Sequence, residues 1–161
     1  MGVTFQERNY IGLAGEFRVM SELLLRGFNP SKSYLQNGYD LILGDGKRIE
    51  VKSSHKKTKI YDVDYRINHP VYGENYSHQK HANCHHYVFT FRSATRSVAR
   101  RGQINKDFDF AICWCMDDNV FYVIPVGDIN GGGFSLGDVS EKATHKFAKH
   151  RNNWDALKEK P

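Results

Sequence analysis

Apolar residues near the N-terminus recur at the spacing of one helix face. Within residues 10–26 they stand three or four positions apart, at Leu13, Phe17, Met20 and Leu24. Gly27 follows this stretch, and glycine commonly ends a helix. The pattern predicts an amphipathic helix over residues 9–26 that turns these four side chains toward a core.

The next part of the chain alternates short apolar runs with turns. Residues 39–53 hold two such runs around a Gly-Asp-Gly turn at 44–46, which predicts a β-hairpin. Residues 31–35 can form a short edge strand before it. Three later segments are rich in aromatic and β-branched side chains and predict further strands, at residues 86–91, 108–116 and 120–126.

Other stretches show different patterns. Residues 54–83 are polar and tyrosine-rich, which predicts a loop-rich excursion with room for a hairpin around residues 60–67. The glycines at 131–133 predict a flexible break, and no Lys-Ser or Lys-Thr follows them as a phosphate-binding loop would require. Helical spacing returns at the end of the chain and predicts a last helix docked on the sheet, through Ala143, Phe147, His150, Trp154 and Leu157.

Composition fits one globular domain. The chain has 161 residues, of which 40% are hydrophobic and 25% charged. No stretch approaches the roughly eighteen consecutive apolar residues of a membrane span, and no apolar signal core is present. The three cysteines form no paired framework, which suits a reducing cytoplasm. Cys113 and Cys115 share one strand face and are expected in the core. We expect a cytoplasmic α/β protein with no membrane segment.

The predicted elements give one domain over residues 1–161. We expect a central mixed four- or five-stranded β-sheet flanked by α-helices, with a basic, loop-rich insertion at about 54–86.

Three charged residues interrupt the apolar hairpin. The turn predicts that Ile42 pairs with Arg48 and Asp40 with Glu50. Because side chains alternate along a strand, Glu50 and Lys52 share a face, and Asp40 joins them. Two carboxylates one strand apart suit Mg²⁺, and a neighbouring ammonium can position a water or stabilise charge on a phosphate. The alternative interpretation is the solvated face of an amphipathic strand.

A third carboxylate lies on the predicted helix. At about 100° per residue, Glu16 falls between Met20 and Leu23, inside the apolar arc, whereas Glu22 points away from it and should be solvated. A carboxylate on an inward face needs a partner. That partner is either the hairpin site or, in the alternative, Arg18 or Arg48 in a salt bridge.

These residues resemble the PD-(D/E)XK nuclease superfamily, which has the restriction-endonuclease-like fold. The resemblance rests on Gly15-Glu16, Tyr39-Asp40 and Glu50-Val51-Lys52. It extends to the strands at 108–116 and 120–126, and to Phe147, Arg151 and Trp154, which are similar to the family's terminal helix. Two departures are the Tyr before Asp40, where the family motif has Pro, and the long segment after the hairpin, which matches nothing in the family.

The resemblance implies a Mg²⁺-dependent DNA endonuclease, with Mn²⁺ able to substitute. Asp40, Glu50 and the carbonyl of Val51 would bind the ion, Glu16 would complete the site, and Lys52 would assist the attacking water. Cleavage would be site-specific, as in restriction and homing enzymes, or structure-specific, as in Holliday-junction resolvases. Because duplex cleavage needs two sites, we expect a homodimer or a larger symmetric oligomer.

Two other hypotheses stay open. One is a non-catalytic nucleic-acid-binding protein with a nuclease-like fold. The other is a structural or toxin-partner protein in which the hairpin charges form an ion-pair network.

The net charge of +5 is unevenly distributed. Residues 55–106 hold ten Lys and Arg against three Asp and Glu, which predicts a nucleic-acid-binding face. The alternative is a basic face that only keeps the protein soluble. The DNA-binding candidates are Lys56, Lys57, Lys59, Arg92, Arg96, Arg100 and Arg101.

A compact group of potential zinc ligands lies in the same region, at His78, His81, Cys84 and His85. Their spacing is not that of a recognised zinc finger, and no second cysteine pair is nearby. The sequence therefore favours a polar loop that contacts phosphate over a zinc site.

Overall fold

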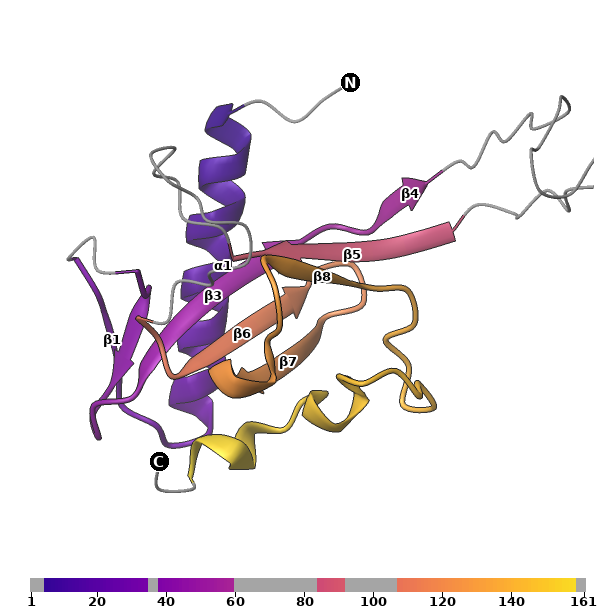
Figure 1. Cartoon of the computed structure of the whole chain (residues 1–161). Coiled ribbons are helices and arrows are strands. Elements are labelled where there is room, and N and C mark those ends of the chain that lie inside the picture. Colours follow the sequence, from indigo (N-terminus) through magenta and orange to yellow (C-terminus); the bar gives the residue numbers. More distant parts are fainter. Residues whose placement is uncertain (1–4, 35–37, 60–83, 92–106, 159–161) are drawn as a thin grey trace, which may run out of the picture.

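The computed structural model describes residues 5–34, 38–59, 84–91 and 107–158 (Figure 1). The described elements are α1 (Phe5–Leu25), β1 (Pro30–Lys32), β2 (Leu41–Leu43), β3 (Arg48–Ser54), β4 (Lys57–Lys59), β5 (Cys84–Thr90), β6 (Phe110–Cys115), β7 (Val120–Pro125), η1 (Val126–Asp128), β8 (Gly133–Leu136), η2 (Ala148–His150) and η3 (Trp154–Leu157). Among these, no helix has the length and apolar character needed to cross a membrane.

Five strands form a mixed sheet in the order β1-β2-β3-β6-β7. The first three strands are antiparallel neighbours, β6 runs parallel to β3, and β7 returns antiparallel beside β6. The predicted mixed sheet and its edge strand are confirmed. Pairing with both β2 and β6 places β3, which carries Glu50 and Lys52, in the middle of the sheet.

The hairpin of β2 and β3 has the predicted register, with Ile42 opposite Arg48. The predicted pairing of Asp40 with Glu50 does not form part of the ladder. Instead, the Asp40 N–H donates to the carbonyl of Ile49 at 2.9 Å. The chain therefore leaves the regular ladder at the residue that carries the first carboxylate.

Helix α1 lies along one face of this sheet (Figure 1) but packs through a different stripe from the one predicted. Val19 and Leu23 are buried beneath it in a core with Ile49 and Val51 of β3. Three of the four residues expected to point inward are instead largely exposed, Leu13 at 40%, Phe17 at 55% and Leu24 at 57%. The helix is apolar on two faces, and periodicity alone selected the outer one.

Gly15 explains why the other stripe faces the sheet. A Cβ built on Gly15 would lie 1.7 Å from the Oγ of Ser53 on β3. Only glycine lets α1 approach β3 this closely, because any side chain would collide with the strand. The close approach fixes the position of the neighbouring Glu16.

The other face of the five-stranded sheet is covered by a second sheet. Strands β4, β5 and β8 form it in that order, with both pairs antiparallel. Tyr87 and Phe89 of β5 and Leu136 of β8 pack in one core with Ala111 and Cys113 of β6. The prediction that helices flank the sheet is therefore wrong on this face, where alternating aromatic residues of β5 provide the cover.

Two smaller predictions are also corrected. The expected flexible break at 131–133 leads directly into β8, which begins at Gly133. The expected loop-rich excursion contains β4 at its start, while the hairpin predicted around residues 60–67 lies outside the described residues. Cys113 and Cys115 are buried in the core, as predicted.

The C-terminal segment does not form the predicted α-helix. It contains two 3₁₀ turns, η2 and η3, separated by Asn152, whose φ is +49°. The Asn152 N–H donates to the Phe121 carbonyl of β7 at 2.7 Å, and its Oδ1 accepts from the Phe121 N–H at 3.0 Å. Pairing with the sheet edge replaces a continuous helix, while Trp154 and Leu157 still enter the core beneath α1.

Candidate active site

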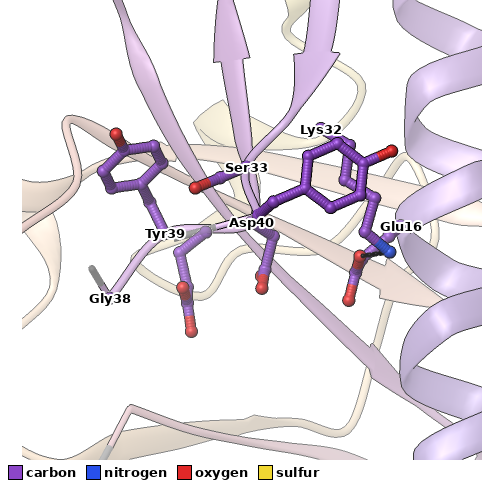
Figure 2. A pocket seen from close by; sticks show the side chains of 8 residues that line it. Glu16, Lys32, Ser33, Gly38, Tyr39 and Asp40 are labelled. Carbon is purple, nitrogen blue, oxygen red and sulfur yellow. Dashed lines mark ion pairs between the residues drawn. The ribbon is translucent and has the colours of Figure 1, made fainter. Parts of the chain in front are cut away.

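A pocket of about 350 Å³ opens beside α1, between the end of β1 and the start of β2. The carboxylates of Glu16 and Asp40 point toward the same opening (Figure 2). All three acidic residues selected from the sequence line this pocket, whose lining consists of Glu16, Lys32, Ser33, Tyr34, Gly38, Tyr39, Asp40 and Glu50.

Asp40 is held in place by both neighbouring strands. Its Oδ2 accepts a hydrogen bond from the Val51 N–H at 2.7 Å, and its carbonyl accepts one from the Ser33 N–H at 2.8 Å. The carboxylate therefore bridges from the start of β2 onto β3. An aspartate suits this position because its short side chain reaches one backbone donor with one oxygen and leaves the other oxygen for the pocket.

Glu50 and Lys52 project from β3 on the same face, as the alternation of side chains predicts. Ile49 precedes Glu50, and Val51 lies between Glu50 and Lys52. Both apolar side chains point to the opposite face and are buried beneath α1. The Lys52 ammonium forms an ion pair with Glu50 Oε1, and the two side chains are 31% and 15% exposed. Lys52 thus lies directly beside one of the two hairpin carboxylates.

Glu16 reaches the pocket from α1, on the other side of the sheet. Its Oε2 lies 2.8 Å from the Nζ of Lys32, the last residue of β1. The alternative partners proposed from the sequence are engaged elsewhere, because Arg18 pairs with Glu22 and Arg48 pairs with Asp109.

Glu22 is also corrected by the structure. It was expected to be solvated, but its side chain is only 12% exposed and pairs with both Arg18 and Arg26. These pairs are i,i+4 neighbours along the helix, which a one-turn spacing brings together.

The pKa values of the two hairpin carboxyls are raised. Burial is the main cause for both Asp40 and Glu50. The negative charge of Glu16 adds to the rise for Asp40, and the charges of Asp40 and Glu16 add to it for Glu50. The Val51 hydrogen bond and the Lys52 and Lys32 charges oppose the rise for Asp40. Close, desolvated carboxylates that resist ionisation are a common property of catalytic sites, and bringing in a cation would relieve them.

The donor set of the pocket can be compared with what Mg²⁺ needs. In the described part of the chain, no group of three or more His, Cys, Asp and Glu side chains is placed to hold a metal ion. Asp40 and Glu50 form a two-carboxylate pair, and Mg²⁺ usually binds through one or two carboxylates together with waters and substrate phosphates. The residues are therefore compatible with an ion that shares its ligands with DNA.

The predicted DNA-binding residues are only partly described. Lys57 is exposed on β4, which also carries Lys59, whereas the Lys56 Nζ lies 2.9 Å from Asp118. The four arginines, Arg92, Arg96, Arg100 and Arg101, lie outside the described residues, as do His78 and His81 of the zinc hypothesis.

Lys32 and Tyr34 are among the lining residues that were not selected from the sequence. Lys32 pairs with Glu16, and Tyr34 is 88% exposed at the pocket. Both lie in the predicted edge strand at 31–35, where a lysine or tyrosine is an ordinary surface residue. Only the approach of β1 to α1 gives Lys32 its partner, and no local pattern signals it.

No protein-family model matches the sequence, and no curated protein is similar to it. Among solved structures, the chain is similar to a bacterial homing endonuclease, I-Ssp6803I, with a TM-score of 0.61 and 19% sequence identity. The match covers 92% of this chain and 91% of the other. The chain has the fold of that endonuclease.

Proposed function

We propose that this protein is a DNA endonuclease of the PD-(D/E)XK type that hydrolyses phosphodiester bonds with Mg²⁺, or with Mn²⁺ in its place. The observation that carries the proposal is the convergence of Glu16, Asp40 and Glu50 on one pocket, with Lys52 paired to Glu50. The fold shared with a homing endonuclease supports the same conclusion.

In this proposal, Asp40 and Glu50 would hold the ion together with the carbonyl of Val51. The bound ion would polarise the scissile phosphate and make water a better nucleophile at neutral pH. Lys52 lies beside Glu50, where its ammonium can orient the attacking water or stabilise the negative charge that develops on the phosphate. Burial of the carboxylates strengthens each of these electrostatic effects.

Glu16 supports this centre from α1, directly or through a water. In the structure its charge is neutralised by Lys32, whose own charge also opposes the rise in the pKa of Asp40. Lys32 therefore supplies positive charge at the mouth of the pocket, where a DNA phosphate would enter. Exposed Lys57 on β4, together with the basic residues 92–101, would extend the contact with the DNA backbone.

The mode of target recognition belongs to the proposal too. A site-specific enzyme of restriction or homing type is favoured by the structural match, and a structure-specific nuclease is the second form of the same activity. Cutting both strands of a duplex would take two copies of the site in a symmetric assembly.

The test uses a plasmid library with randomised inserts, incubated with purified protein and Mg²⁺ or Mn²⁺, followed by mapping of the new DNA ends. Wild type should produce mapped ends, and Asp40→Ala and Lys52→Ala should not. Lys158→Ala is the matched control, because it removes an exposed lysine in the C-terminal segment, away from the lining of the pocket. DNA binding without cleavage by wild type would instead support the non-catalytic nucleic-acid-binding hypothesis.

A further inference from the structure

The outward side of α1 carries an apolar stripe that stays exposed in the described part of the chain. Five large apolar side chains on it are 40% to 78% exposed: Tyr10, Leu13, Phe17, Leu24 and Leu25. Half-buried Met20 borders the stripe, and the small residues Ala14 and Ser21 lie within it. Scattered surface apolar residues are ordinary, but a continuous stripe along a helix usually marks an interaction site.

The stripe is also free of charge. Between residues 10 and 25 the charged residues are Glu16, Arg18 and Glu22. At about 100° per residue, all three fall outside the stripe, and each is held in a salt bridge. The Lys32 ammonium lies close to the Phe17 ring at the edge of the stripe, but it is paired with Glu16. Because the stripe itself carries no charged side chain, it offers little to a phosphate backbone or to anionic lipid headgroups, and another apolar protein surface fits it best.

The spacing within the stripe is that of a helix–helix seam. Tyr10, Leu13, Phe17, Met20 and Leu24 follow each other at intervals of three and four, the a and d positions of a heptad pattern. The seam is complementary to itself in an antiparallel pair centred on Phe17. Such a pair brings Tyr10 of one copy beside Leu24 of the other, and it sets the two helix dipoles in opposition.

We infer that α1 is the dimerisation surface of this protein and that its occupant is α1 of a second copy, packed antiparallel about a two-fold axis near Phe17. The choice of a second copy also rests on the proposed function, because duplex cleavage requires two sites. The stripe offers on the order of 700 Å² per copy, close to the roughly 800 Å² that each partner contributes to a stable interface.

This seam lies next to the candidate active site. The Lys32 Nζ lies 5.2 Å from the centre of the Phe17 ring, and the same ammonium pairs with Glu16. An α1 pair would therefore place the two pockets on either side of the symmetry axis, each beside the interface. That arrangement suits a substrate with two strands related by its own two-fold symmetry.

The test measures the mass in solution by sedimentation velocity. Wild type should sediment at twice the chain mass of 18.6 kDa. Leu24→Glu and Leu13→Glu, at opposite ends of the seam, should each sediment as monomers, with the dimer dissociation constant raised by at least about 100-fold. Gly12→Glu is the matched control, because it puts the same charge on the same helix, outside the stripe, where an added Cβ meets nothing within 4 Å. That variant should stay dimeric, and circular dichroism should show all variants folded.

Cross-linking tests the orientation. Phe17→Cys should form a disulfide-linked dimer under mild oxidation, whereas Leu24→Cys should not, because an antiparallel pair holds the two positions about 21 Å apart. A monomeric wild type, or a dimer that survives both Glu substitutions, overturns the inference; equal cross-linking at both positions overturns the antiparallel arrangement. If the wild type is a monomer that cleaves DNA, the dimer inference fails and the nuclease proposal stands. If the wild type is a dimer that the Glu substitutions dissociate but that never cleaves DNA, the dimer inference stands and the nuclease proposal fails.

Discussion

The Nζ of Lys32 lies 2.8 Å from the Oε2 of Glu16, so a lysine from the edge strand neutralises the carboxylate that α1 brings to the pocket. The charge of the same lysine opposes the rise in the pKa of Asp40 that burial causes. A cation placed among three carboxylates competes with any divalent ion that binds there. The charge of Lys32 should therefore affect how tightly the site binds a divalent ion.

Replacing Lys32 should strengthen metal binding. In Lys32→Met the apolar stem remains and the charge is lost, so we expect Mn²⁺ to bind about 3- to 10-fold more tightly, the effect of removing one partly screened like charge. Isothermal titration calorimetry with Mn²⁺ and no DNA measures it directly. Lys158→Met, an exposed lysine near the C-terminus, should leave the affinity unchanged. An affinity that stays constant or falls in Lys32→Met would contradict this role.

The ionised carboxylate of Asp40 should lower the free energy of unfolding at neutral pH. Burial and the charge of Glu16 raise its pKa, so its stabilising contribution is fully present below the ordinary value of 3.8 and is lost as the pH rises through the raised folded value. Asp40→Asn can still accept the Val51 hydrogen bond. We expect the variant to be more stable than wild type by about 1 kcal/mol near pH 7, a rise of roughly 2–4 °C in Tm.

Denaturant unfolding between about pH 4 and about pH 8 measures this difference. The gap between Asp40→Asn and wild type should widen as the pH rises. A gap that narrows with rising pH, or a variant less stable than wild type at neutral pH, would show that Asp40 is a stabilising ion-pair partner rather than a strained functional group.

Gly15 should be intolerant of any side chain. In Gly15→Ala the new Cβ would collide with Ser53, so α1 must shift from β3, at a cost of about 1–3 kcal/mol in unfolding free energy. Gly12→Ala, one turn earlier where nothing lies within 4 Å, should instead gain roughly 0.5–1 kcal/mol from better helix propensity. Thermal unfolding of the pair measures both, and equal effects at the two positions would show that α1 does not approach β3 so closely.

Lys57 should contribute to DNA binding through charge alone. We expect Lys57→Ala to lower the slope of log K against log salt by about 0.9, the value for one lost phosphate contact, for every duplex sequence tried. Fluorescence anisotropy at several salt concentrations gives the slope. A lysine whose loss alters neither the slope nor the affinity would place β4 away from the DNA.

The hairpin of β2 and β3 could be predicted closely because its signals are local. The Gly-containing turn set the register of Ile42 with Arg48, and the alternation of side chains placed Glu50 and Lys52 on one face. The predicted pairing of Asp40 with Glu50 did not form, because the chain leaves the ladder at Asp40 and its carboxylate accepts a hydrogen bond from the Val51 N–H. Local geometry was enough to bring these three residues together.

What the sequence could not give depended on distant contacts. Helix α1 has two apolar faces, and the choice between Val19 and Phe17 as the buried residue was decided by the fit of Gly15 against Ser53. The last helix was lost because Asn152 pairs with Phe121 on a sheet edge. Lys32 pairs with Glu16 only because β1 lies next to α1 in the fold. A lysine in a short edge strand gives no local signal of that contact.

The most direct test of the nuclease proposal is the single-turnover cleavage rate of Lys52→Met on a duplex that wild type cuts in Mg²⁺. The proposal predicts a loss of about 10²- to 10³-fold in rate, the usual cost of removing one charged group that acts on the transition state, with DNA affinity within about 3-fold of wild type. A Lys52→Met protein that cleaves as fast as wild type would contradict it.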